Sequence, residues 1–211
     1  LTIVAMGTSL PETAVSVSAS ITGNNELAVS NVVGSNIFNL MVVIGVCAMI
    51  ATVNVAKETI KRDIPFSLIC AGLLLILGIL GVGDKSGMML GHFDGVIFIG
   101  AFAGYIFYMI KIALKASKEG KKVEIEGGSD EDIKLISVPL SILFIVGGAA
   151  AIAVGGDITV DAASRIASDL GMSQTLIGLT IVSIGTSLPE LVTSIVAARK
   201  NEVDMALGNA I

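Results

Sequence analysis

The stretch GTSLPE at residues 7–12 occurs a second time, unchanged, at residues 185–190. The likeness extends outward from these six residues, because residues 1–33 align without gaps with residues 179–211 and are identical at 14 positions. Agreement of this extent predicts an internal duplication, in which two copies of one structural unit contribute to a single fold.

The sequence around both copies is strongly apolar. Of the 211 residues, 54% are hydrophobic and only 15% are charged, and the mean hydropathy is +0.89. Soluble domains carry roughly 25% charged residues, whereas a run of about 20 apolar residues is what a bilayer accepts. This composition excludes soluble, secreted, disordered and nucleic-acid-binding classes and predicts an integral membrane protein. Runs without Asp, Glu, Lys, Arg or His cover residues 27–56, 64–82, 135–156 and 170–189.

Apolar runs divide the chain into seven predicted helical segments, the first and last of them partial. Helices fit better than barrel strands, because the runs are continuously apolar and do not alternate over about ten residues. Eleven of the 13 basic residues fall in connections on one side of these segments, and Lys85 and Arg165 fall on the other. Basic residues gather on the cytoplasmic side, so the loop 115–133 is predicted to be cytoplasmic. The predicted segments are 1–22, 28–53, 64–82, 94–114, 134–156, 173–198 and 203 onward.

This topology gives the two copies opposite orientations, because the turn inside the first copy lies on the basic-poor face and the turn inside the second on the basic-rich face. Inverted repeats with interrupted helices are typical of secondary transporters. We therefore expect a first inverted half at 1–114, with its repeat in 1–50, and a second at 134–211, with its repeat from about 173. The second copy stops one residue before the counterpart of Gly34, so we expect further spans in a complete protein.

Glu12 and Glu190 are the only charged residues deep inside the apolar segments. A carboxylate at bilayer depth is energetically costly and therefore indicates a functional site. Each glutamate follows a proline, which cannot donate to the carbonyl four residues earlier, so each helix is expected to break there. The next helix adds a polar stripe of Asn31, Ser35 and Asn39. Carboxylate, hydroxyl, amide and carbonyl oxygens select hard cations such as Ca²⁺ and Na⁺.

The two GTSLPE motifs, with GSNIFN at residues 34–39 on the following helix, resemble the alpha repeats of the sodium/calcium exchanger family. The prokaryotic branch is the most similar, because the loop 115–133 is too short for a large regulatory domain. The resemblance implies a fold of ten helices in two inverted halves, here lacking the first helix and about the last two. It also implies a plasma-membrane antiporter that extrudes Ca²⁺ against inward Na⁺ flow by alternating access.

The same resemblance implies roles for individual residues. Glu12 and Glu190 correspond to the central Ca²⁺ carboxylates. The counterparts of the ligands on the helix after the first motif would lie past Ile211, so the chain as given holds an incomplete site. The remaining implied cation ligands are Thr8 and Thr186 through carbonyl and hydroxyl oxygens, Ser9 and Ser187 near the sodium positions, Ser35 and Asn39 on the next helix, and Ala5 and Ser183 through outer carbonyls.

Two alternatives remain open at this point. A Ca²⁺/H⁺ exchanger or a K⁺-dependent Na⁺/Ca²⁺ exchanger would use the same glutamates, since a buried carboxylate can also carry a proton. An intramembrane protease would need a pair of aspartates at depth, which this sequence lacks, so no enzyme activity is expected. The expected partners are the lipid bilayer and the transported ions, with neither nucleic acid nor an obligatory protein partner.

Overall fold

The structure is a computed structural model that describes residues 7–57, 59–80, 90–118 and 137–211, and all regular secondary structure in these ranges is helical. The predicted all-helical fold is thereby confirmed. In the described ranges, three helices are long and apolar enough to cross a membrane, and one bent pair gives a fourth candidate. The three helices are Asn25–Ile50, Thr59–Ile79 and His92–Ile112, and the pair is Gln174–Thr186 with Leu188–Arg199.

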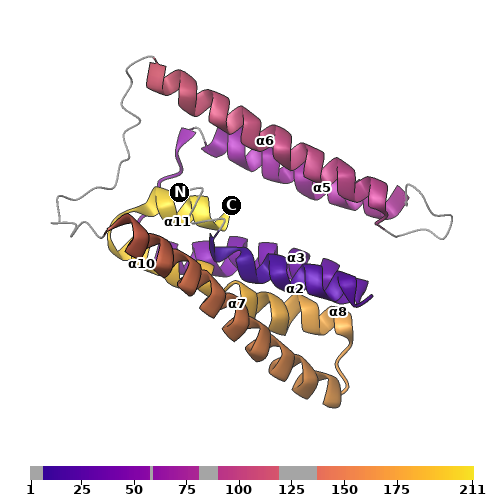
Figure 1. Ribbon diagram of the computed structural model, residues 1–211. Helices are drawn as coiled ribbons and strands as arrows, with labels where there is room; N and C mark the ends of the chain where they lie inside the picture. Colours follow the sequence, from indigo (N-terminus) through magenta and orange to yellow (C-terminus); the bar gives the residue numbers. More distant parts are fainter. Residues whose placement is uncertain (1–6, 58, 81–89, 119–136) are drawn as a thin grey trace. The chain divides into compact units, whose positions relative to one another are not determined.

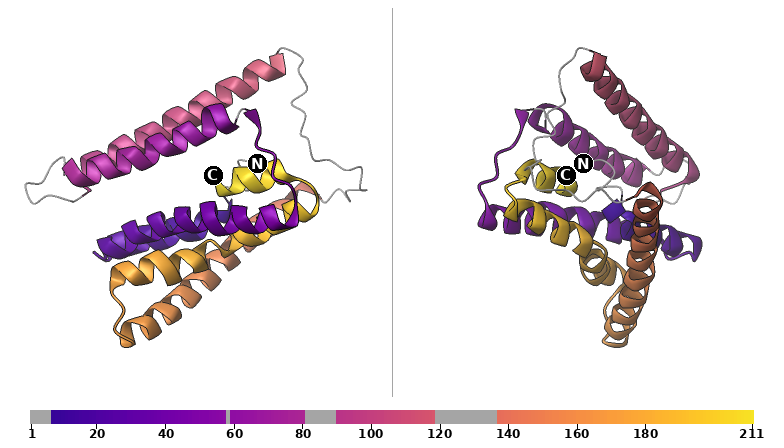
Figure 2. Two further views of the ribbon diagram at one scale, coloured as in Figure 1. Left: turned by 180° about the vertical axis from the view of Figure 1, so that it is seen from behind. Right: turned by 60° about the vertical axis from the view of Figure 1, so that its left-hand side comes forward.

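Chain contacts define two compact units, of which the first joins Leu1–Ala56 with Ser129–Ile211 and so contains both sequence copies. Within it, α2 and α3 lie side by side, and α7 forms a hairpin with the segment that begins at α8 (Figures 1 and 2). Its elements are α2 (Leu10–Ile21), α3 (Asn25–Phe38), the π-helical segment η1 (Asn39–Val43), α4 (Ile44–Ile50), α7 (Val138–Asp169), α8 (Gln174–Ile177), the π-helical segment η3 (Gly178–Val182), α9 (Ser183–Thr186), α10 (Leu188–Arg199) and α11 (Val203–Ala210).

The second unit, Lys57–Gly128, contains two long helices. Asp63 joins them, because it accepts a hydrogen bond from the Tyr105 hydroxyl at 3.1 Å and pairs with Arg62 at 2.6 Å. The rings of Phe66 and Tyr105 stack with their centroids 4.0 Å apart. The elements of this unit are the π-helical segment η2 (Thr59–Asp63), α5 (Ile64–Leu80) and α6 (His92–Lys118).

The two sequence copies fold into the same helix–turn–helix unit. In the first copy, Gly23 has φ +80° and Asn24 donates its N–H to the Ala19 carbonyl at 2.8 Å. In the second copy, Asn201 has φ +60° and Glu202 donates to the Ala197 carbonyl at 2.9 Å. Glycine and asparagine are the residues that best accept this left-handed conformation at a helix end. The duplication seen in the sequence is therefore a structural repeat.

The structure corrects the predicted ends of several segments. The predicted segment 134–156 is wrong at its C-terminal end, because α7 continues to Asp169. Gly155 and Gly156 do not stop the helix; it stops at Gly171, whose φ of +84° allows Met172 to donate back to the Ala167 carbonyl. Residues 59–63 and 115–118, predicted as connections, are helical as well. The rest of the loop 115–133 lies outside the described residues.

Small residues bring α3 close to the second copy's bent segment. A Cβ built on Gly34 would lie 2.6 Å from the Leu179 carbonyl oxygen and 2.6 Å from Ser183 Oγ. A Cβ on Gly178 would overlap the side chain of Ser30 on α3. Membrane helices pack closely where glycine lets the backbones approach. The helix that follows the first motif is therefore held directly against the segment that leads into the second motif.

Candidate functional site

Both copies of the GTSLPE motif interrupt a helix, as the sequence predicts. Residues 7 and 8 are helical, and α2 begins anew at Leu10 after a turn at Ser9. In the second copy, α9 ends at Thr186 and α10 begins at Leu188, and the two parts are bent by 44°. The prolines lie in the first turn of α2 and α10, where their missing N–H leaves no hydrogen bond unmade. Each glutamate therefore lies in the first turn of a new helix, where the helix dipole favours a negative charge.

The two motifs are joined by crossed hydrogen bonds between serine and glutamate. Ser187 of the second motif donates from Oγ to Glu12 Oε1 at 2.7 Å. Ser9 of the first motif donates to Glu190 Oε1 at 3.0 Å. Serine and glutamate are three residues apart within each motif, so this exchange requires the N-terminal turns of α2 and α10 to face one another. The structure thus brings the two predicted carboxylates into one site.

Each carboxylate also keeps one oxygen without a partner. Oε2 of Glu12 and Oε2 of Glu190 are both buried and accept no hydrogen bond, and Glu190 as a whole is 0% exposed. Among the described residues, no basic side chain pairs with either glutamate. A buried, unpaired carboxylate oxygen is costly unless something binds it. Each of these oxygens is therefore available as a ligand for a cation.

The predicted threonines also reach across to the opposite copy. Thr8 donates from Oγ1 to Asn209 Oδ1 at 3.0 Å, and Thr186 donates to Asn31 Oδ1 at 3.3 Å. Asn31 and Asn209 occupy equivalent positions in the two copies, as Thr8 and Thr186 do. In the sequence, Asn31 is visible only as part of a polar stripe, and Asn209 is one of the positions at which the two copies are identical. Their contact with the opposite motif is a tertiary relation that helix spacing does not reveal.

The other predicted ligands, Ser35, Asn39, Ser183 and Ala5, differ in their hydrogen-bond partners and in whether the structure describes them. Ser35 joins the site, because its Oγ lies 3.4 Å from Thr186 Oγ1. Asn39 begins the π-helical segment η1, and its Oδ1 is buried without a partner. The Ser183 carbonyl accepts from the Ser187 N–H at 3.1 Å and from Thr186 Oγ1 at 3.3 Å. Ala5 lies outside the described residues.

The donor set of this site consists of oxygen atoms. Among the residues that the structure describes, no three His, Cys, Asp or Glu side chains form a group able to hold a metal ion. Two carboxylates surrounded by hydroxyl and amide oxygens remain, together with the carbonyl groups at the C-terminal ends of the broken helices. Such a set suits a hard cation that exchanges its water readily for protein oxygens, and it offers no soft ligand for zinc or copper.

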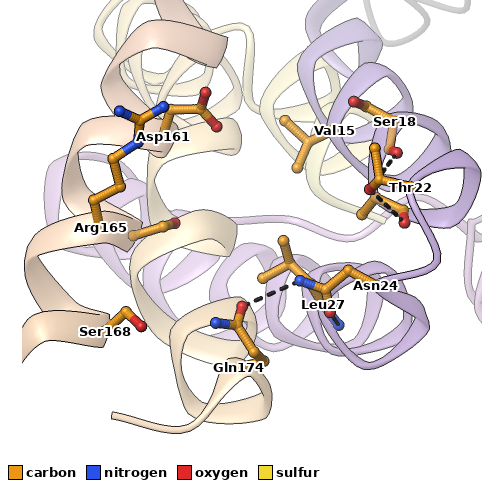
Figure 3. Close-up of a pocket in the computed structure, with 11 residues that line it drawn as sticks. Val15, Ser18, Thr22, Asn24, Leu27, Asp161, Arg165, Ser168 and Gln174 are labelled. Carbon is orange, nitrogen blue, oxygen red and sulfur yellow. Dashed lines mark hydrogen bonds between the residues drawn. The ribbon is translucent and has the colours of Figure 1, made fainter. Parts of the chain in front are cut away.

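A polar cavity of about 430 Å³ lies beside the first motif's helix. Figure 3 shows Ser18 and Thr22 of α2 on one side of it, and Asp161 and Arg165 of α7 on the other. At one end Asn24 Nδ2 donates to Gln174 Oε1 at 3.2 Å. Val15, which also lines the cavity, is three residues from Glu12, or about one helical turn. One residue that lines the cavity is therefore a single helical turn from Glu12 along α2.

Comparison with known proteins places the chain in a family. The sequence profile of the family described as sodium/calcium exchanger protein matches residues 1–111 and 140–211. The chain belongs to the sodium/calcium exchanger family, as the motif resemblance implies.

Individual relatives agree with this assignment. The chain is 38% identical to the CaxA protein of Alkalimonas amylolytica over 215 residues, covering all of this chain and 63% of CaxA. It is 31% identical to the sodium/calcium exchanger MaX1 of Methanosarcina acetivorans, covering all of this chain and 67% of MaX1. Its structure resembles that of the sodium-calcium exchanger NCX_Mj soaked with Na⁺ and Sr²⁺, with a TM-score of 0.67 and 32% identity over 99% of this chain and 63% of NCX_Mj. The chain thus spans somewhat under two thirds of CaxA and of NCX_Mj.

Proposed function

We propose that the whole protein exchanges Na⁺ for Ca²⁺ across the membrane and that both ions bind between Glu12 and Glu190. The observation that carries this proposal is the crossed pairing of the two motifs, Ser9 with Glu190 and Ser187 with Glu12. It brings two carboxylates from distant parts of the chain together and leaves Oε2 of each buried and unpartnered. Membership in the sodium/calcium exchanger family supports the same function.

The chemistry of the site explains why the two ions would exclude each other. Two carboxylates neutralise one Ca²⁺, and the same oxygens can be shared by several Na⁺. A site with two bare carboxylates is too costly to close away from water, so movement across the membrane is favoured only when cations fill it. Competition at one set of oxygens then couples the flow of Na⁺ to the flow of Ca²⁺ in the opposite direction.

The transport cycle that we propose is alternating access around a site near the bilayer midplane. The two inverted halves, 1–114 and 134–211, would move relative to each other about the paired motifs. The loop 115–133 would face the cytoplasm of a prokaryotic cell, as the distribution of basic residues indicates. Broken helices at both motifs support this cycle, since irregular backbone at membrane depth belongs beside a cavity or inside the protein.

The driving ion is tested by measuring Ca²⁺ uptake into vesicles that contain the whole protein. We expect an outwardly directed Na⁺ gradient to drive uptake at constant pH and without K⁺. Uptake that follows a pH gradient in the absence of Na⁺ would assign the protein as a Ca²⁺/H⁺ exchanger instead. Na⁺-driven uptake that needs K⁺ would assign it as a K⁺-dependent exchanger. This alternative has some support in the sequence, because 49 residues of the chain align with sodium/potassium/calcium exchanger 2 of Gallus gallus at 41% identity.

The polar cavity beside α2 provides a prediction about ion access. Replacing Ser18 with phenylalanine places a ring in the cavity, so we expect exchange to slow by at least about threefold with unchanged equilibrium Ca²⁺ affinity. The measurements are initial exchange rates in vesicles and equilibrium Ca²⁺ binding in detergent. Val17→Phe is the control, because Val17 is 52% exposed and does not line the cavity. Equal rates for the two variants would show that ions do not pass this way.

A further inference from the structure

Two asparagines, Asn31 on α3 and Asn209 on α11, bond to both sequence copies at once. Asn31 donates from Nδ2 to Ser16 Oγ at 2.9 Å and to the Glu12 carbonyl oxygen at 3.4 Å, both in its own copy. Its Oδ1 accepts from Thr186 in the other copy at 3.3 Å. The side chain is 0% exposed, so each of these bonds is made away from solvent.

Asn209 repeats this arrangement in the opposite direction. Its Nδ2 donates to the Glu190 carbonyl oxygen at 3.2 Å, to Ser194 Oγ at 3.2 Å and to Thr193 Oγ1 at 2.9 Å, and its Oδ1 accepts from Thr8 at 3.0 Å. Glu190, Ser194 and Thr8 have their counterparts in the first set at the same repeat positions, whereas Thr193 corresponds to Val15. Asn31 therefore links the Glu12 backbone to Thr186, and Asn209 links the Glu190 backbone to Thr8.

The hydrogen-bond partners determine how each amide is oriented. A backbone carbonyl can only accept, so the NH₂ group of Asn31 must face the Glu12 carbonyl and its oxygen must face Thr186. Thr186 then has to donate its single hydroxyl hydrogen in that direction, where the Ser183 carbonyl at 3.3 Å is a second acceptor. The lone pairs of Thr186 Oγ1 then point away from the amide, where they can accept from Ser35 Oγ at 3.4 Å or bind a cation.

We propose that Asn31 and Asn209 are positioning residues that fix the threonine hydroxyls of the opposite repeat as oxygen ligands for the transported cation. The inference rests on the proposed function, because it assigns the residues that orient the ligands of that same site. Since each amide holds one glutamate backbone and the opposite threonine together, neither motif can shift its ligands alone. The two halves of the site are therefore formed or lost together.

Asn36 on α3 shows what an asparagine does when it has only a local role. Its Nδ2 donates to the Val32 carbonyl of the same helix at 2.8 Å, and its side chain is exposed. Asn36 thus bonds within its own helix, whereas Asn31 also accepts a hydrogen bond from the opposite motif. Asn36→Ala is therefore the matched control for Asn31→Ala, with the same residue type, the same helix and the same substitution.

The test is a double-mutant cycle on apparent Ca²⁺ affinity in vesicles containing the full chain. We expect Asn31→Ala to weaken the affinity about tenfold, as the loss of a buried hydrogen bond would, and Asn36→Ala to leave it unchanged. If Asn31 acts through Thr186, adding Asn31→Ala to Thr186→Val causes no further loss. Adding it to Thr8→Val, the threonine held by Asn209, multiplies the two losses.

A purely structural role would give a different pattern, because general loosening of the fold would affect both threonines equally. Equal coupling to Thr8 and Thr186, no coupling to either, or an Asn31→Ala variant that behaves like Asn36→Ala would each overturn the inference. Should Asn31→Ala fail to fold, Asn209→Ala with Thr8→Val gives the same cycle at the less buried asparagine. Failure of the proposed function is recognised separately, since the unmodified protein would then show no Na⁺-coupled Ca²⁺ uptake.

Discussion

Replacing Glu190 with glutamine is expected to weaken Ca²⁺ binding at least about 100-fold and to abolish exchange. The side chain is 0% exposed and its Oε2 has no hydrogen-bond partner. Glutamine has the same shape and can still accept the hydrogen bond from Ser9, so the variant removes the charge and little else. Leaving a buried charge without its partner costs about 3–5 kcal/mol, which corresponds to at least a hundredfold in affinity.

Glu12→Gln is expected to give the same result, because Glu12 holds the equivalent position and accepts from Ser187. The measurement is equilibrium Ca²⁺ binding to the full chain, followed by Na⁺-driven uptake in vesicles. Glu26→Gln is the matched control: Glu26 is exposed near the start of α3, where it accepts from Thr175 at 3.3 Å, and its variant should bind Ca²⁺ within about twofold of the unmodified protein. Normal Ca²⁺ binding by either site variant would remove the basis for a two-glutamate site.

The second large effect is expected from Gly34→Ala, which introduces a methyl group where two backbones meet. That group would lie 2.6 Å from the Leu179 carbonyl oxygen, a backbone atom that cannot swing aside. The α3 helix would have to move away from η3, at a cost of about 1–3 kcal/mol. Because η3 leads into Thr186 and α3 carries Asn31 and Ser35, the same movement would separate groups that form the site. We expect both a lower melting temperature in detergent and loss of exchange.

Gly45→Ala is the control for this substitution. Gly45 lies in α4, and a Cβ built there meets nothing within 4 Å. Alanine also favours helix over glycine by roughly 1 kcal/mol, so Gly45→Ala should leave stability unchanged or raise it. A Gly34→Ala protein that melts and transports like the Gly45→Ala protein would contradict the close packing of α3 on η3.

The sequence predicted much of the site because its signals are local. Proline after Ser-Leu removes a backbone donor whatever the surroundings, and the predicted helix breaks occur at Ser9 and Ser187. The end of α7 was mispredicted for an equally local reason. The uncharged run ends at Gly156, before Asp157, yet α7 continues to Asp169, and the chain turns where Gly171 takes a positive φ. The length of an apolar run therefore locates the uncharged part of a helix but not the residue at which the helix ends.

What the sequence determined by itself is the all-helical membrane fold, the duplication and the residue types of the site, because apolar run length, repeat identity and proline chemistry act within short stretches of chain. Only the tertiary structure decided which groups meet. Ser9 could have bonded to the glutamate of its own motif, but it donates to Glu190, and Thr186 donates to Asn31. These partners are more than 150 residues apart, and the close approach of α3 to η3 at Gly34 holds Asn31 near Thr186.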